Sequence, residues 1–280
     1  MSIDIALISS MQQIEKTIIL MKSVCFHHEN VKFHIIHADI TAEWFVKLNT
    51  YLYELNCEVI SIEVNSQIFM QYEPLHENMN YYAYLKLSIP QLVKAERVLF
   101  LNNQCIVNAS LKSLWKLDLT DYALAATPDL FLDHLSVTHH RFPDLKPYFN
   151  AGMILFNVDL CNKSPFYWQM YRALREQKQL TFAEQDILNL VCVERWYPLS
   201  KLYNFQAGIK YIFEQHQAPQ FVDEALDVEG HTPYIIQYNE LEPFNEQGIE
   251  VPYEELYIFY EDLEWEEIKK KRTWKSGDVV

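Results

Sequence analysis

Glycine is scarce in this chain of 280 residues: there are five, and the closest two, Gly230 and Gly248, are 18 positions apart. A loop that cradles phosphate needs clustered glycines, because its backbone N–H groups must approach the anion closely. The sequence therefore contains neither a dinucleotide-binding fingerprint nor a P-loop, and the G-x-S-x-G nucleophile turn is absent as well. These absences exclude the common nucleotide-enzyme architectures.

Cysteine is also sparse. The five cysteines are odd in number and widely scattered, at Cys25, Cys57, Cys105, Cys161 and Cys192. Such spacing matches neither a disulfide framework nor a zinc site, and it agrees with a reducing compartment.

Long apolar runs are missing, since none approaches the ~18 residues of a membrane span. Residues 1–8 lack the basic start and the small-residue cleavage site of a secretory signal, and they have the pattern of a buried first strand. These features predict a cytoplasmic chain.

Positive charge is absent from one long stretch. Residues 211–268 carry 16 acidic residues and no Lys or Arg, whereas residues 1–210 are nearly balanced, within a total net charge of −15. This balance predicts no general attraction to nucleic acid. The basic cluster at 269–275 can touch anionic lipid, but it better suits the end of a helix that begins at Glu254 and Glu255, where cations favour the helix dipole. We therefore expect membrane contact to be at most peripheral.

Half of the residues are hydrophobic, enough to bury a sizeable core, and apolar runs alternate with helical patterns. This β-α-β order predicts an α/β sheet with parallel strands and helices on both faces. We expect one domain over 1–250 and an acidic, aromatic, helical tail over 251–280. The expected strands are Ile3–Ser9, Lys32–His37, Glu58–Glu63, Arg97–Val107, Ala123–Ala126 and Ala151–Asn157. The expected helices are Ile14–Phe26, Ala42–Leu55, Tyr81–Lys94 and Ser164–Glu176.

Polar insertions fall near three expected strand or helix ends, at Asn102–Gln104, Phe149–Gly152 and Glu184–Asp186. In open α/β sheets, ligands bind beyond the carboxyl ends of the strands. We expect the three segments to fall at such carboxyl ends, although Asn and Gln form caps and turns more often than they catalyse.

Four segments carry a resemblance to a known family: Tyr82-Ala-Tyr-Leu-Lys-Leu87, Arg97-Val-Leu-Phe-Leu101 with Cys105–Trp115, Phe149–Asn157, and Glu184-Gln-Asp-Ile-Leu-Asn189. In order and spacing, over roughly residues 3–245, they resemble family 8 glycosyltransferases, which include bacterial lipooligosaccharide galactosyltransferases and glycogenin. The resemblance implies a GT-A fold, that is, a Rossmann-like nucleotide-sugar transferase domain with a mixed, mostly parallel sheet flanked by helices.

The resemblance also implies where a metal would bind. The family holds Mn²⁺ or Mg²⁺ with an Asp-x-Asp motif and a later His, and the metal neutralises the departing diphosphate. The corresponding positions here are Asn102, Gln104 and Gln237. Three neutral amides hold a hard cation far more weakly than two carboxylates and an imidazole. No metal cofactor is therefore expected.

Other positions that the family uses for the nucleotide also depart from its pattern. The early Asp-Asp pair corresponds to Ser10 and Met11, and an Arg before the metal strand corresponds to Tyr84. A Lys that touches the diphosphate aligns near Glu242, two residues after Glu240. Because the family's Lys and Arg are missing and the carboxylates Glu240 and Glu242 lie near the Lys position, diphosphate binding is expected to be poor.

The sugar side of the family's site is retained. By resemblance, Asp129, Asn150, Ala151, Glu184 and Gln185 contact the sugar, with Gln185 beside the anomeric carbon and Asp129 positioning hydroxyls. The same resemblance puts His76, Lys86, Asn102 and Gln104 on the nucleotide side. Each run also shapes the fold and is open to a purely structural interpretation.

Two main hypotheses follow, and binding of some other small ligand in the altered cleft is a third possibility. The first is a family 8-like protein that has lost metal-dependent transfer and either binds a glycan or partners an active transferase, with residues 211–268 as one interaction face. The alternative is an active retaining hexosyltransferase in surface-glycan or glycoprotein synthesis that uses a nucleotide-sugar without the usual metal site. In that case Gln185 and Asp129 would be catalytic, and Lys86 or another N-terminal base would meet the diphosphate.

Overall fold

The structure, a computed structural model, describes residues 2–65, 82–134, 145, 147–163, 165–176, 180–238 and 251–277. Three residues named above, His76, Glu240 and Glu242, lie outside the described residues.

Seven strands of the described chain form one mixed sheet in the order β3-β2-β1-β4-β7-β6-β8. β7 runs antiparallel to both of its neighbours, whereas the other neighbouring strands pair in parallel. The expected mixed, mostly parallel sheet is confirmed. The strands are β1 (Ile3–Ile8), β2 (Val31–His37), β3 (Glu58–Glu63), β4 (Arg97–Leu101), β6 (Leu124–Pro128), β7 (Phe149–Asn157) and β8 (Trp196–Pro198).

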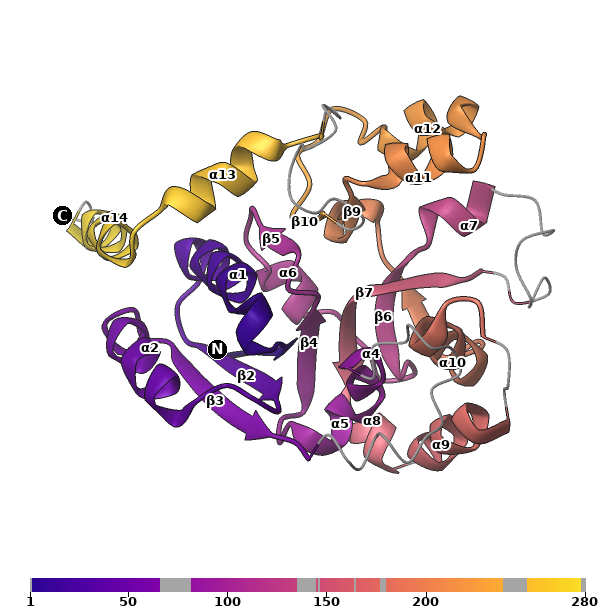
Figure 1. The fold of residues 1–280 in the computed structure, drawn as a ribbon, viewed down its shortest axis with the longest axis horizontal. Helices are drawn as coiled ribbons and strands as arrows, with labels where there is room; N and C mark the ends of the chain where they lie inside the picture. Colours follow the sequence, from indigo (N-terminus) through magenta and orange to yellow (C-terminus); the bar gives the residue numbers. More distant parts are fainter. Residues whose placement is uncertain are drawn as a thin grey trace.

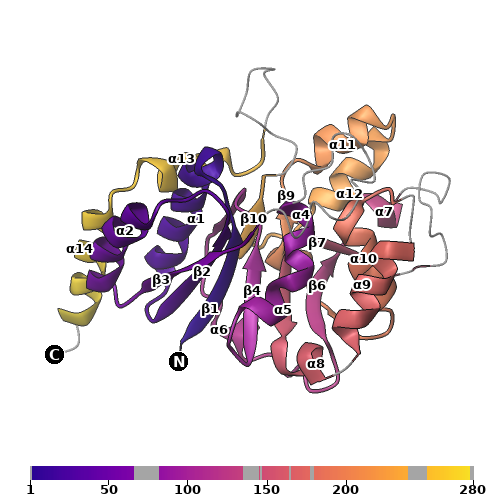
Figure 2. The same cartoon turned by 60° about the horizontal axis from the view of Figure 1, so that its bottom comes forward.

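Helices cover both faces of this sheet, as expected (Figures 1 and 2). Alternate residues of each strand point to opposite faces, so that Ile5 and Leu7 join the core under α1 and α2, whereas Ala6 joins the core under α4, α5 and α8 to α10. The helices are α1 (Ile14–His27), α2 (Ala42–Glu54), α4 (Tyr82–Leu85), α5 (Ile89–Leu92), α6 (Lys112–Trp115), α7 (Leu130–His134), α8 (Val158–Lys163), α9 (Phe166–Glu176), α10 (Ala183–Val191), α11 (Ile209–Gln215) and α12 (Val222–Leu226). Within the described ranges, no helix has both the length and the apolarity to span a bilayer.

The single strand expected over 97–107 is wrong, because the chain turns after β4. Beyond the turn, β5 (Cys105–Val107) enters a second sheet, where β10 (Ile235–Gln237) lies between β5 and β9 (Phe205–Gln206). This small sheet lies over the edge of the large sheet at which β4 ends (Figure 1).

The helix expected over Tyr81–Lys94 is also interrupted. A 3₁₀ turn, Lys86–Ser88, separates α4 from α5, and the chain leaves the helix at Val93. Pro90 has no N–H to donate to the carbonyl four residues earlier, which is that of Lys86. The interruption therefore falls at the residue that the sequence assigns to the nucleotide side.

The C-terminal tail contains two helices, α13 (Glu254–Asp262) and α14 (Trp265–Gly277), where we expected one. Leu263 adopts an extended conformation and is buried. The backbone N–H of Glu264 donates to the carboxylate of Glu267 at 2.9 Å, as in a capping box that starts a new helix.

The tail packs against α1 and α2 (Figure 2). The guanidinium of Arg272 donates to the carbonyls of Cys25 and His28, at the end of α1, and to that of Leu55, after α2. These carbonyls lie at helix C-termini, where a cation is favourable. Arg272 of the basic cluster thus contacts the chain itself, while the domain boundary at residue 250 stays a prediction.

Candidate functional site

A cavity of about 510 Å³ opens at the edge of the large sheet where β4 ends. Because β7 is antiparallel to β4, its first residues, Phe149–Gly152, lie at this same edge. The start of α10 adds Glu184 and Gln185, so residues of all three polar insertions line one cavity. Only Asn102–Gln104 follows the carboxyl end of a strand, as expected, because Phe149–Gly152 begins β7 and Glu184–Asp186 begins a helix. The described lining residues are Lys86, Asn102, Gln104, Asp129, Phe131, Asn150, Ala151, Gly152, Phe182, Glu184, Gln185, Gln206, Tyr211, Ile212, His216 and Gln237.

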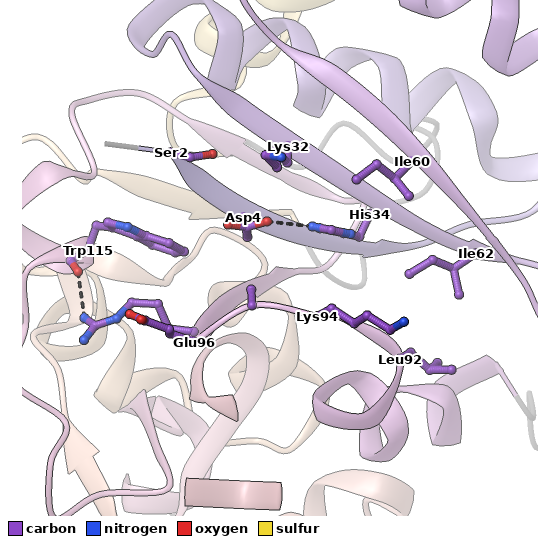
Figure 3. Close-up of a pocket in the computed structure, with 12 residues that line it drawn as sticks. Ser2, Asp4, Lys32, His34, Ile60, Ile62, Leu92, Lys94, Glu96 and Trp115 are labelled. Carbon is purple, nitrogen blue, oxygen red and sulfur yellow. Dashed lines mark hydrogen bonds and ion pairs between the residues drawn. The ribbon is translucent and has the colours of Figure 1, made fainter. Parts of the chain in front are cut away.

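A second cavity, of about 530 Å³, lies toward the amino ends of β1 and β2 (Figure 3). Its wall holds His34, whose Nε2 lies 2.8 Å from Asp4 Oδ1, together with Lys94 and Trp115. None of the residues that the sequence assigns to the site lines it. Since ligands of open α/β sheets bind at the carboxyl ends of the strands, we take the first cavity as the candidate site.

The turn after β4 is held in place by backbone hydrogen bonds to two other strands. The N–H of Asn102 donates to the Gly152 carbonyl of β7 at 2.9 Å, and the N–H of Tyr238 donates to the Gln104 carbonyl at 3.0 Å. The Asn102 side chain also accepts the Gln104 N–H at 3.3 Å, which closes the turn. These bonds fix both amide side chains at the cavity edge.

Gln237 completes this edge from β10. Its strand places it beside Cys105 of β5 and Gln206 of β9, and its side chain lies over Gly152. Gln237 is 4% exposed, and its Oε1 is buried without a hydrogen-bond partner. The three amides that the resemblance assigns to the family's metal positions therefore line the same cavity, although Gln237 is distant in sequence from the other two.

This donor set does not fit the family's metal. Asn102 Oδ1 already accepts a backbone N–H, and the three amides bring no negative charge to a divalent cation. Among the described residues, no group of three or more His, Cys, Asp or Glu side chains lies close enough together to hold a metal ion. We therefore derive no chemistry through a metal.

Asp129, which also lines the cavity, is a hydrogen-bond acceptor for four groups. Its Oδ1 accepts the backbone N–H groups of Phe131 at 3.2 Å and Leu132 at 3.1 Å. Its Oδ2 accepts the side-chain amides of Asn150 and Gln185, both at 3.1 Å. Burial raises the pKa of Asp129, and these hydrogen bonds oppose that effect.

The two amides held by Asp129 also bind the start of β7. Gln185 Oε1 accepts the Ala151 N–H at 2.8 Å, and Asn150 Oδ1 accepts the Gly152 N–H at 2.9 Å. Asn204, which the sequence did not single out, donates to the same Asn150 oxygen at 2.9 Å. Four of the five residues that the resemblance puts on the sugar side, Asp129, Asn150, Ala151 and Gln185, are thus connected by hydrogen bonds.

The first turn of α10 is locked onto β7 by two further side chains of the Glu184–Asn189 run. Asp186 accepts the backbone N–H groups of Thr181 and Phe182 at 2.7 and 2.9 Å. Asn189 Oδ1 accepts the Phe149 N–H at 2.8 Å, and its Nδ2 donates to the Phe149 carbonyl at 2.9 Å. The structural interpretation of this run therefore holds for Asp186 and Asn189.

Lys86 and Glu184 form a buried ion pair at the cavity wall. Lys86 Nζ lies 2.7 Å from Glu184 Oε1, and the two side chains are only 8% and 14% exposed. Lys86 also lies over the ring of Phe100, with its Nζ 4.9 Å from the ring centroid. The Lys86 ammonium, expected to face a nucleotide, thus already has an anionic partner.

The other nucleotide-side positions lie in the surrounding structure. Tyr84 is 9% exposed, and burial together with the charge of Glu184 raises the pKa of its phenol. Ser10 precedes the 3₁₀ turn Met11–Gln13, and the Met11 N–H donates to Asp39 Oδ1 at 3.1 Å. Neither Ser10 nor Met11 offers a carboxylate to a nucleoside.

Sequence reasoning missed several lining residues. Gln206 is 1% exposed, and its Nε2 is buried without a partner, like Gln237 Oε1 on the neighbouring strand. Phe131, Tyr211 and His216 form part of the lining from α7, α11 and the residue after it. Strand β9 is only two residues long, so no sequence period marks Gln206.

Comparisons with known proteins identify the relatives of this chain. Glycosyltransferases GlyB and GlyF of Streptococcus pneumoniae serotype 4 (strain ATCC BAA-334 / TIGR4) are 27% and 29% identical to it over 255 residues each. These alignments cover 91% and 90% of this chain but 60% of each relative. The chain thus spans about 60% of the length of these curated relatives.

Solved structures confirm the GT-A fold. The crystal structure of glycosyltransferase GlyE from Streptococcus pneumoniae TIGR4 matches with a TM-score of 0.79 at 24% identity, over 98% of this chain and 64% of that one. The galactosyltransferase LgtC, in complex with donor and acceptor sugar analogs, matches with a TM-score of 0.76 at 20% identity, over 92% of this chain and 95% of that one. Residues 4–226 also match the sequence profile of glycosyl transferase family 8. The resemblance carried by the four sequence segments is therefore confirmed, and the chain belongs to glycosyl transferase family 8.

Proposed function

We propose that this family 8 chain binds a neutral sugar or glycan in the cavity at the end of β4 and does not carry out metal-dependent sugar transfer. The observation that carries the proposal is the replacement of the metal donors by Asn102, Gln104 and Gln237, which meet at one cavity edge. Amides donate and accept hydrogen bonds without charge, as sugar hydroxyls do. They suit a neutral polyhydroxylated ligand better than a metal diphosphate.

Asp129 contributes by positioning other side chains. A carboxylate offers about four lone-pair sites, and Asp129 already accepts four hydrogen bonds. Its role in this proposal is therefore to orient Asn150 and Gln185, which face the ligand. Glu184 and Lys86 contribute the remaining polar groups at the wall, and the Ala151 backbone borders the floor.

Aromatic side chains supply the apolar part of such a site. Phe131 and Tyr211 line the cavity beside His216. Sugar-binding pockets combine a few placed polar groups with apolar or aromatic surfaces. A pyranose ring has both polar hydroxyl groups and apolar C–H faces, whereas a diphosphate has no apolar surface.

The intact network of Asp129, Asn150 and Gln185 favours a second candidate, a retaining hexosyltransferase that works without the metal site. In that case Gln185 would lie beside the anomeric carbon and Lys86 would have to leave Glu184 to meet the diphosphate. Release of sugar from a nucleotide-sugar in EDTA, and its loss in Lys86→Ala, would support this second candidate and overturn the first.

Calorimetry separates the two candidates. We would titrate the protein with UDP, UDP-hexoses and neutral oligosaccharides, first with Mn²⁺ and then with EDTA. The proposal predicts binding of a neutral oligosaccharide that is the same in both buffers, together with weak or no binding of UDP-hexose. Binding of UDP-hexose that strengthens with Mn²⁺ would overturn it.

A restoration experiment tests the loss of transfer itself. Asn102→Asp, Gln104→Asp and Gln237→His together rebuild the family's donor set. We expect no transferase activity, because Ser10, Met11 and Tyr84 still replace the nucleotide contacts of the family. Mn²⁺-dependent transfer by the triple variant would contradict this expectation.

The alternative role as a partner of an active transferase is tested separately, by adding the chain to such an enzyme and measuring its rate. An unchanged rate would argue against this role.

A further inference from the structure

Lys86 is the only Lys or Arg among the described residues that line the cavity. The same wall carries two carboxylates, Asp129 and Glu184, and the titratable side chain of His216. An anionic ligand would therefore depend on Lys86 for charge compensation. The ammonium of Lys86 is already 2.7 Å from Glu184 Oε1.

Both partners of this ion pair are held in position. Lys86 lies in the 3₁₀ turn between α4 and α5, and the Phe100 ring lies against its ammonium. Glu184 lies in the first turn of α10, where the helix dipole favours a negative charge. Asp186 and Asn189 fix that turn to the preceding loop and to β7.

The residue that precedes Glu184 adds a second constraint. Ala183 adopts a left-handed conformation, with a φ of 47°, which residues with a Cβ rarely adopt. The backbone N–H of Phe182, just before it, is one of the two that bind Asp186. The backbone immediately before Glu184 is therefore held by a hydrogen bond at Phe182.

We propose that Glu184 is a specificity-determining residue that acts as an internal counter-ion, so that the cavity accepts neutral sugars and rejects phosphorylated ligands. The inference rests on the proposed function, because it takes the cavity as the ligand site. A diphosphate that reaches Lys86 must displace Glu184 and then remain beside the two carboxylates of the wall. Like charges at contact distance in a partly buried site oppose this strongly.

The test uses Glu184→Gln, which keeps the side-chain length and an acceptor oxygen for Lys86 but removes the charge. Inorganic pyrophosphate and UDP are titrated by calorimetry, in EDTA and at low ionic strength. We expect Glu184→Gln to bind both at least about tenfold more tightly than the unmodified protein. The gain should shrink as salt is added, because the interaction is electrostatic.

Two further variants show whether the gain comes from the cavity. In Lys86→Gln/Glu184→Gln the gain should disappear, because no permanent cation remains among the described lining residues. Glu176→Gln is the matched control: Arg172 and Glu176 are also 2.7 Å apart, but their side chains are 76% and 55% exposed. It changes the net charge equally and should leave pyrophosphate binding unchanged.

Circular dichroism and thermal melting first establish that each variant folds. If Glu184→Gln does not fold, Glu184→Asp, which withdraws the carboxylate by one methylene, should gain affinity for pyrophosphate to a smaller degree. No gain in a folded Glu184 variant would overturn the inference, as would an equal gain in Glu176→Gln. Neutral-oligosaccharide binding by the unmodified protein is measured in parallel, so that a failure of the proposed function is seen separately.

Discussion

The side chain of Gln237 lies directly against the backbone of Gly152, so closely that a Cβ at residue 152 would meet Gln237 Oε1 at 2.0 Å. Gly152 belongs to β7 of the large sheet and Gln237 to β10 of the small sheet. The absence of a side chain at 152 therefore lets the two sheets meet at the cavity. Residue 152 is a glycine because the carboxamide of Gln237 occupies the space that a Cβ would need.

Gly152→Ala is expected to destabilise the protein by about 1–2 kcal/mol, because the new methyl group displaces a carboxamide that is 4% exposed. Urea denaturation measures this loss. In a Gln237→Ala background the same change at 152 should cost much less, since the clashing atoms are gone. Equal costs in both backgrounds would contradict the contact.

Asp129→Asn is expected to weaken neutral-glycan binding. An Asn at 129 can still accept the Phe131 and Leu132 N–H groups, but its NH₂ would then face the amides of Asn150 and Gln185, which are also donors. A buried donor without an acceptor costs about 1–3 kcal/mol, partly offset here because a buried charge is removed.

Calorimetry with the neutral oligosaccharide measures the effect of Asp129→Asn. Asp118→Asn is the matched control, because Asp118 also accepts a backbone N–H two residues ahead, from Thr120 at 3.0 Å, but is exposed. Unchanged glycan binding in Asp129→Asn would argue against the positioning role of Asp129.

His28 is expected to make the protein less stable in mild acid. Its Nε2 accepts the Leu111 N–H at 2.9 Å, and burial lowers the pKa of His28 from 6.5 to about 4. Because the folded state binds this proton more weakly than the unfolded state, the contribution of His28 is fully present above pH 6.5. It is lost as the pH falls toward 4, by up to about 3 kcal/mol.

His28→Gln, which can still accept the Leu111 N–H but does not titrate in this range, isolates that contribution. The unfolding free energies of the two proteins are measured by urea denaturation from pH 7 to pH 4. As the pH falls, the unmodified protein should lose more stability than His28→Gln. A difference that does not change with pH would contradict the lowered pKa of His28.

Arg272→Ala is expected to loosen the tail, because one guanidinium caps carbonyls at the ends of both α1 and α2. Loss of hydrogen bonds to a charged group typically costs about 1.5–3 kcal/mol. Hydrogen exchange in α14 and the melting temperature measure the effect. Lys270→Ala, an exposed change two residues earlier, is the control and should have a smaller effect on both.

The strands of the large sheet show which parts of the fold could be predicted from the sequence alone. The apolar runs around Ile3–Ile8 and Val31–His37 predict strands, because consecutive apolar residues can be buried on both faces of a parallel sheet. The pattern over 97–107 predicts one strand, but the turn at Asn102–Gln104 sends its second half into another sheet. Local pattern does not report which partner a strand will pair with.

The sequence by itself determined the fold class and the family, because both depend on local periodicity and on short motifs in order. It also determined that the positions which the resemblance assigns to the family's metal carry amides, which bring no charge. Only the tertiary structure decided that Gln237 meets Gly152, that Glu184 neutralises Lys86 and that Arg272 caps two helices. Each of these contacts joins residues far apart in the chain, so each depends on sheet order and helix packing.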